Sequence, residues 1–125
     1  MDAPYSLELE PEVVRWLEGL SPEHYMQVEE KADLLDARPT TLGEPHARHL
    51  GDGLRELRVS LSGVAFRVTY WLAPQRRIVL LTVFRKTRMR EVAEVKRAKL
   101  AHQTCAREHG PAHVTYSRDP AEEVL

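Results

Sequence analysis

The first forty residues show one short alternating stretch and then two stretches with the hydrophobic spacing of helices. Residues 5–10 alternate between apolar and polar side chains, which predicts a short strand. Pro11 and Pro22 suit the first turns of two helices, because proline needs no amide partner there, and Ser21 is a suitable N-cap for the second. Pro39 ends the second stretch. These residues therefore predict a strand followed by a helical hairpin.

The hydrophobic spacing changes to period two after a loop. Residues 40–53 are rich in glycine and proline and predict that loop. Apolar and polar side chains then alternate in two stretches, and residues 78–84 are nearly all apolar, so residues 54–85 predict a three-stranded antiparallel meander. A final helix is predicted for residues 89–107. Its expected apolar positions are Val92, Val95, Ala98 and Leu100.

The order β-α-α-β-β-β-α is typical of an α+β fold, with an antiparallel sheet, a helical hairpin and a C-terminal helix. We expect the helices to lie against one face of the sheet and part of the other face to be open to solvent. The length of 125 residues fits one domain, predicted for residues 1–109, with residues 110–125 as a mobile tail.

Two features of the sequence predict a cytoplasmic protein. The first ten residues are acidic and lack the apolar stretch of a secretory signal, and no apolar run is long enough to cross a bilayer. The single cysteine, Cys105, excludes an internal disulfide framework and is expected to be a small packing residue.

Charge is strongly segregated along a chain whose formal net charge is only −1. Residues 1–47 carry an excess of eight acidic side chains, residues 48–107 an excess of ten basic ones, and residues 108–125 an excess of three acidic ones. The basic segment predicts contact with a polyanion or an acidic partner, whereas the alternative is neutralisation between the two halves within the fold.

Several of these cations are predicted to meet on the open face of the sheet. If Ser62-Gly63 is a two-residue turn, Arg58 lies directly opposite Arg67. Two like charges across a ladder are unfavourable unless an anion or a carboxylate lies between them, and Glu56 is one such carboxylate. Arg85 and Lys86 end the last predicted strand. A slip of one residue in that strand would move Arg85 to the other face.

Residues 53–101 contain a recognisable succession of motifs: Leu-Arg-Glu-Leu-Arg at 54–58, the pair Phe66-Arg67, the strand end Phe84-Arg85-Lys86-Thr87, and a helix with Glu94-Val95 and Ala98. In this order and spacing they resemble the core of the HigB-like toxins of the RelE/ParE superfamily. The resemblance covers 49 of the 125 residues, and the preceding strand and helices match the family's order without a sharp motif.

The resemblance implies a RelE-like fold and the toxin of a toxin–antitoxin system. Such toxins enter the ribosome and cut mRNA without a metal or cofactor, through attack of the RNA's own 2′-hydroxyl. The implied partners are the ribosome with its mRNA and a cognate antitoxin, often a helix-turn-helix protein. Two alternatives remain open: a ParE-like inhibitor of DNA gyrase, and an inactive homologue that only binds its antitoxin.

The resemblance also implies roles for individual residues. The expected catalytic residues, which would bind the phosphate and its developing charge, are Arg58, Arg67, Arg85 and Lys86. The expected RNA-binding residues are Arg55, Trp71, Arg88 and Arg90, although Trp71 suits burial against the last helix equally well. The candidates for proton transfer are His102, His109 and Tyr116. No metal-ligand set is predicted, since His46 and His49 lack a third ligand.

Overall fold

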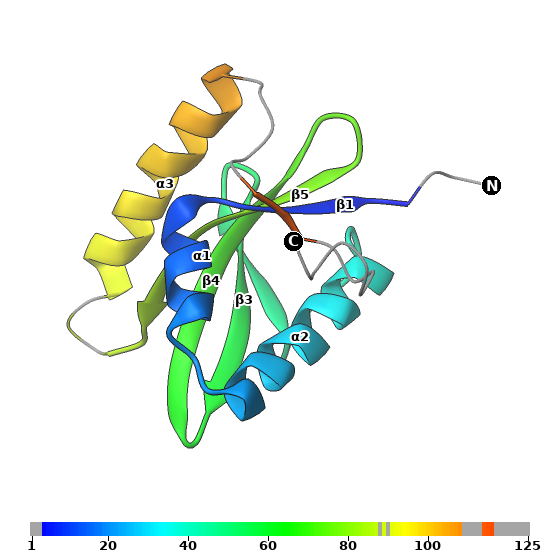
Figure 1. The fold of residues 1–125 in the computed structure, drawn as a ribbon. Helices are drawn as coiled ribbons and strands as arrows, with labels where there is room; N and C mark the ends of the chain where they lie inside the picture. Colours follow the sequence, from blue (N-terminus) through cyan, green and yellow to red (C-terminus); the bar gives the residue numbers. More distant parts are fainter. Residues whose placement is uncertain (1–3, 88, 90, 109–113, 117–125) are drawn as a thin grey trace.

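The computed structural model describes residues 4–87, 89, 91–108 and 114–116. Six strands form one sheet in the order β2-β3-β4-β5-β1-β6, and three helices accompany it in this part of the chain (Figure 1). The elements are β1 (Ser6–Leu9), α1 (Pro11–Glu18), α2 (Pro22–Ala37), β2 (Ala47–Gly51), β3 (Leu54–Leu61), β4 (Val64–Ala73), β5 (Arg77–Arg85), α3 (Glu91–Glu108) and β6 (Val114–Tyr116).

The predicted succession of strand, two helices, meander and final helix is confirmed. Ser21 caps α2 as expected, because its hydroxyl accepts a hydrogen bond of 3.2 Å from the backbone N–H of His24. The β3–β4 hairpin has the predicted register, with Leu61 opposite Val64. This register decides which side chains of β3 and β4 share a face.

Part of the predicted loop is a strand. Within residues 40–53, β2 pairs antiparallel with β3 and forms one edge of the sheet. Gly51, Asp52 and Gly53 connect the two strands with φ angles of 100°, 56° and 82°. Glycine adopts such angles without steric cost, and Asp-Gly is typical of tight hairpin turns. Gly51 and Gly53 therefore belong to the turn of a β2–β3 hairpin, in a segment that we predicted to be an irregular loop.

One pair of strands departs from the expected antiparallel sheet. β1 pairs parallel with β5, with Leu7 opposite Ile78, so the sheet is mixed. The long connection between these strands permits parallel pairing. β6 pairs antiparallel with β1, so these three residues of the expected mobile tail belong to the sheet. The other residues of 110–125 lie outside the described part of the chain.

Helices cover both faces of the sheet, whereas we expected them on one face. Along β4, Val68 and Tyr70 pack in the core with α1 and α2, while Trp71 and Ala73 pack with α3. Alternate side chains of a strand point to opposite faces, so these are two separate cores. In Figure 1, α3 lies at the left and α2 at the lower right, with strands of the sheet between them. We name the two surfaces of the sheet the α1/α2 face and the α3 face.

α3 contacts the sheet through two small buried side chains, one near its middle and one near its end. Ala98 and Cys105 are buried there, which confirms Cys105 as a packing residue. Val92 and Leu100, two expected apolar contacts, are instead 83% and 62% exposed. The apolar positions of α3 are irregularly spaced because few of its side chains touch the sheet. A helix with the length and apolar composition of a membrane span is not found in the described part of the chain.

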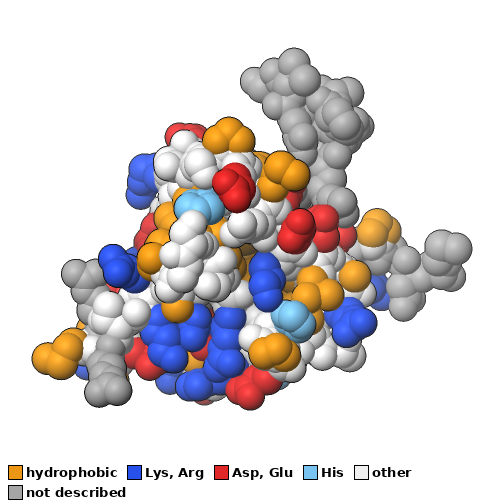
Figure 2. Space-filling view, turned by 90° about the horizontal axis from the view of Figure 1, so that it is seen from below, with side chains coloured by type: hydrophobic (Ala, Val, Ile, Leu, Met, Phe, Trp, Pro, Cys, Tyr) orange, Lys and Arg blue, Asp and Glu red, His pale blue; other side chains and the backbone are white. Residues whose placement is uncertain are grey.

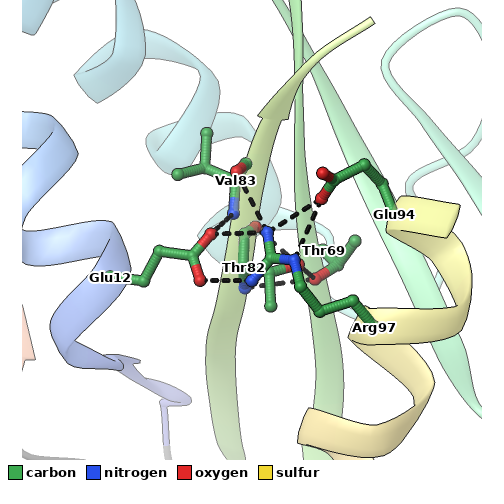
Figure 3. A network of polar contacts seen from close by, with 6 residues as sticks. All are labelled: Glu12, Thr69, Thr82, Val83, Glu94 and Arg97. Atoms are coloured by element: carbon green, nitrogen blue, oxygen red, sulfur yellow. Dashed lines mark hydrogen bonds and ion pairs between the residues drawn. The ribbon is translucent and has the colours of Figure 1, made fainter. Parts of the chain in front are cut away.

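A polar cluster, the Arg97 cluster, closes the edge of β5 beyond the end of β1 (Figure 3). Glu12 of α1 accepts the backbone N–H of Val83 at 2.9 Å. Arg97 of α3 donates to both Glu12 oxygens, at 2.5 and 2.8 Å, and to Glu94 at 2.9 and 3.0 Å. These bonds join α1 and α3 around the edge of the sheet.

Ionisation of Glu12 is favoured by this cluster. Burial by itself would raise the pKa of Glu12, but the hydrogen bonds from Arg97 and Val83 and the charges of Arg97 and Arg15 outweigh it. The pKa of Glu12 therefore lies below its ordinary value.

Candidate nucleic-acid interface

The α3 face carries polar side chains in adjacent rows across the strands. One row runs from Arg48 of β2 through Glu56 and Thr69 to Thr82 of β5. The next row, nearer the β3–β4 turn, holds Arg58, Arg67 and Phe84. Directly paired side chains lie about 5 Å apart at Cβ, so neighbours within a row are in reach of one another.

Arg58 and Arg67 form the centre of this interface, and we call them the arginine pair. They are opposite each other in the sheet, as predicted. Between them lies the carboxylate of Glu56, whose Oε2 is 3.7 Å from Nε of Arg58 and 3.4 Å from Nε of Arg67. Glu56 has no exposed surface. It supplies the counter-charge without which two facing arginines would repel each other.

The arginine pair retains donors that the carboxylate does not use. Neither oxygen of Glu56, and neither Nε of the arginine pair, makes a hydrogen bond within the described residues. Arg58 also lies 3.7 Å from Glu44, an exposed carboxylate of the preceding loop, and Arg67 donates to the backbone oxygen of Phe66. Two guanidinium groups thus face one buried carboxylate. An excess of planar cationic donors suits a phosphate group.

Arg85 does not join this pair. It is opposite Phe66, whose ring lies 5.4 Å from that of Trp16 in α1, so Arg85 belongs to the α1/α2 face. The pairing of β4 with β5 shifts by one residue between Thr69 and Tyr70 of β4, and the sequence did not reveal this shift. Lys86 follows on the α3 face, and its N–H donates to Ala65 at 2.8 Å. The structure therefore brings Arg58 and Arg67 together, places Lys86 just beyond β5 beside Ala65, and puts Arg85 on the other face.

Two of the expected RNA-binding residues have structural contacts instead. Arg55 points to the α1/α2 face and donates to the carbonyl oxygens of Pro39 and Thr40. Trp71 packs under α3, with its ring 4.6 Å from that of His102, so it follows the burial alternative. Arg88 and Arg90, the other two candidates, lie outside the described residues.

Of the proton-transfer candidates, only His102 has a side chain within the described part of the chain, and it lies away from the arginine pair. His102 contacts Trp71, which is four residues beyond Arg67 along β4, or about 13 Å at the rise of a strand. Burial lowers the pKa of His102, against the opposing charge of Asp52, and so favours the neutral ring. His109 lies outside the described residues, as does the side chain of Tyr116.

Arg48 was missed because its segment was predicted to be a loop. In β2 it lies opposite Glu56 on the α3 face, next to the row of the arginine pair. The signal that could have found it was the turn Gly51-Asp52-Gly53, since Asp-Gly is typical of tight hairpins. Figure 2 views the end of the molecule that carries the β3–β4 turn and shows Lys and Arg side chains gathered in one group, with acidic side chains beside them. Within the described residues, no cluster of three or more His, Cys, Asp and Glu could hold a metal ion.

Comparison with known proteins gives one family and one fold. A family model described as phage-derived protein Gp49-like (DUF891) matches residues 15–105. No curated protein matches the chain. A double arginine-to-alanine mutant of the E. coli toxin RelE in the free state superposes with a TM-score of 0.56, at 14% identity over 80% of this chain and 98% of that one.

Two complexes contain the same fold. The archaeal RelE–RelB complex from Pyrococcus horikoshii OT3 matches with a TM-score of 0.53, at 24% identity over 69% of this chain and 99% of that one. The intact E. coli RelBE toxin–antitoxin complex matches with a TM-score of 0.52, at 14% identity over 69% and 100%. At these identities the likeness establishes a RelE-like fold.

Proposed function

This chain belongs to the family of phage-derived Gp49-like proteins, and from that premise we propose that it is the toxin of a toxin–antitoxin system, of the HigB type, that cleaves mRNA on the ribosome. The observation that carries the proposal is the arginine pair. Two guanidinium groups meet on one face of the sheet around a single buried carboxylate. Two cations around one buried carboxylate would bind the negatively charged phosphate of a phosphodiester, whereas the stability of the fold alone does not require them.

The proposed reaction needs no nucleophile from the protein. The 2′-hydroxyl of one nucleotide attacks the adjacent phosphorus, and the bond from phosphorus to the 5′ oxygen of the next nucleotide breaks. The 2′ oxygen loses a proton and the leaving 5′ oxygen gains one, so the products are a 2′,3′-cyclic phosphate and a 5′-hydroxyl. Negative charge builds up on the non-bridging phosphoryl oxygens in the transition state, and preorganised donors stabilise it there.

Each residue of the interface has a stated part in this reaction. The arginine pair binds the non-bridging oxygens, since a guanidinium stays protonated and can bind two oxygens at once. Lys86, exposed at the end of β5, adds a point charge from the same face. Glu56 fixes the two guanidinium groups relative to each other. Arg85 has no part in it, because it lies on the opposite face.

The proposal includes an antitoxin as partner. Two of the solved structures that share this fold are complexes of a RelE protein with RelB. In cells this chain would be held by a small antitoxin with a helix-turn-helix domain that covers the basic surface until it is degraded.

The test is to induce the chain in cells without its antitoxin and to map the 5′ ends of cellular mRNA by primer extension. We expect growth arrest and new 5′ ends within codons, and both should disappear in a folded Arg58→Ala variant. Intact transcripts with an activated DNA-damage response would overturn the proposal in favour of gyrase inhibition. Normal growth with intact transcripts would overturn it in favour of a protein that only binds its antitoxin.

A further inference from the structure

A groove runs between β2 and the first half of α3, and the function proposed above does not use it. Its volume is about 720 Å³, within the range of about 300–1,000 Å³ that is usual for ligand pockets. Leu50 of β2 and Val92 and Val95 of α3 line it with apolar surface. Val92 is 83% exposed, so this surface is open to a ligand.

Cations dominate the walls of this groove. Arg48 comes from β2, and Lys96 and Lys99 come from α3, against one acidic residue, Glu91. The amine of Lys99 reaches across to Gly51 at the end of β2. Three cations against one carboxylate, in a groove with an apolar lining, would attract an anion that also has flat apolar groups.

The groove is continuous with the arginine pair through Arg48. Arg48 is paired with Glu56, and Glu56 is two residues from Arg58 on the same face of β3, which is about 7 Å along the strand. A polyanion held at the arginine pair therefore has its next cation at Arg48 and the following ones at Lys96 and Lys99. This continuity favours a nucleic acid over an acidic protein as the occupant.

The side chains that line the groove fit single-stranded RNA. Unpaired bases pack on apolar side chains and stack on the planar guanidinium group of arginine, which Arg48 supplies here. The lysines suit phosphates as point charges. A duplex hides its base faces and would leave the apolar lining uncovered.

We infer that the groove between β2 and α3 binds the single-stranded RNA that flanks the scissile phosphate, with Arg48, Lys96 and Lys99 on its phosphates. The inference rests on the proposed function for the identity of the strand. It adds a binding site on elements that the reaction itself does not use, so binding and cleavage can be measured separately.

The experiment measures binding of the full chain to a short fluorescent RNA by anisotropy at several salt concentrations. The RNA carries 2′-O-methyl riboses, which lack the attacking hydroxyl, so cleavage cannot affect the result. The test variants are Lys96→Gln with Lys99→Gln, and separately Arg48→Gln. Arg107→Gln is the matched control, an exposed cation in the last turn of the same helix. Thermal melts check that every variant is folded.

The inference predicts about tenfold weaker RNA binding for the double lysine variant, and a salt slope reduced by about 1.4, since each single-strand phosphate contact contributes about 0.7. Arg48→Gln should weaken binding as well, and Arg107→Gln should not. Wild-type affinity in both test variants would overturn the inference. So would unchanged RNA binding together with lost binding of a polyglutamate peptide, which would assign the groove to an acidic protein.

Failure of this inference and failure of the proposed function give different results. If the groove variants lose RNA affinity while the wild-type chain cuts no mRNA, the groove stands as an RNA site and the nuclease proposal falls. If the wild-type chain cuts mRNA while the groove variants keep full affinity, the nuclease proposal stands and the groove assignment falls.

Discussion

The Arg97 cluster has two carboxylates for one arginine, whereas the arginine pair has one buried carboxylate, Glu56, and one exposed carboxylate, Glu44, for two arginines. Arg97 has two carboxylates, Glu12 and Glu94, and hydrogen bonds of 2.5 to 3.0 Å to both. The arginine pair has two guanidinium groups for one buried carboxylate, with ion-pair distances of 3.4 and 3.7 Å. Both groups lie beside the same sheet. Arg97 hydrogen-bonds to its carboxylates, whereas the Nε atoms of the arginine pair make no hydrogen bond within the described residues.

This difference separates an arginine that holds the structure from one that is available to a ligand. In the Arg97 cluster, most donors already have acceptors from α1, α3 or the free edge of β5, so an incoming anion would find few to bind (Figure 3). In the arginine pair, the single buried carboxylate of Glu56 faces both guanidinium groups, the exposed Glu44 lies beside Arg58, and neither Nε makes a hydrogen bond within the described residues. Arginines of one protein therefore need to be compared by their carboxylate partners as well as by their exposure.

The largest effect is expected for Arg67→Lys. The lysine keeps the charge that faces Glu56 but loses the planar fork, so we expect the rate of mRNA cleavage to fall about 100-fold. The melting temperature should change little, because the buried carboxylate keeps a cation beside it. Cleavage in a reconstituted ribosome complex measures the first effect and a thermal melt the second. A folded variant with the wild-type rate would refute a role of Arg67 in phosphate binding.

A loss of stability comes next, for Glu56→Gln. Without the carboxylate, two neighbouring guanidinium groups lose their counter-charge, and we expect the free energy of unfolding to fall by about 2–3 kcal/mol. Added phosphate should restore part of that stability, because the anion takes the place of the carboxylate. Urea unfolding with and without phosphate measures both. Wild-type stability would mean that Glu56 does not hold the pair together.

A smaller loss is expected for Arg97→Ala. Glu12 and Glu94 lose their shared cation at a half-exposed position, so the free energy of unfolding should fall by about 1–2 kcal/mol. Cleavage per folded molecule should stay at the wild-type value, because the proposed function gives the Arg97 cluster no part in binding RNA. If the folded variant cleaves much more slowly, the distinction between a structural and a ligand-binding arginine is wrong.

The smallest effect is a pH dependence of stability from Glu12. Its pKa is lower in the folded chain than in the unfolded chain, so the unfolded state binds more protons at acidic pH. The contribution is fully present above the unfolded pKa and is lost as pH falls through the folded pKa. We expect less than about 1 kcal/mol, since the side chain is partly exposed. Urea unfolding at acidic pH should show a shallower dependence for Glu12→Gln, and an identical dependence would contradict the assignment.

The sequence predicts the order of the elements and the centre of the interface, because both depend on short-range patterns. Two prolines and Ser21 mark the helix starts, and the Ser62-Gly63 turn places Arg58 opposite Arg67. Glu56, two residues from Arg58, follows from the same alternation. Such features need only the local geometry of a turn or a strand.

The features that the sequence does not predict depend on long-range packing. The pairing of β1 beside β5 and the position of α3 on the second face join segments that lie far apart in the chain. Arg85 was misplaced because an irregularity in β5 changes which side chains share a face, and no residue type marks it. The groove beside Arg48 forms only when β2 and α3 come together.

The most direct test of the account compares Arg58→Ala with Arg85→Ala in cleavage of ribosome-bound mRNA. The two residues are of one type, on strands of one sheet, and differ in the face they occupy. The account predicts a rate about 100-fold below wild type for Arg58→Ala, and a rate close to wild type for Arg85→Ala. Equal losses in the two variants, or an unchanged rate in folded Arg58→Ala, would contradict it.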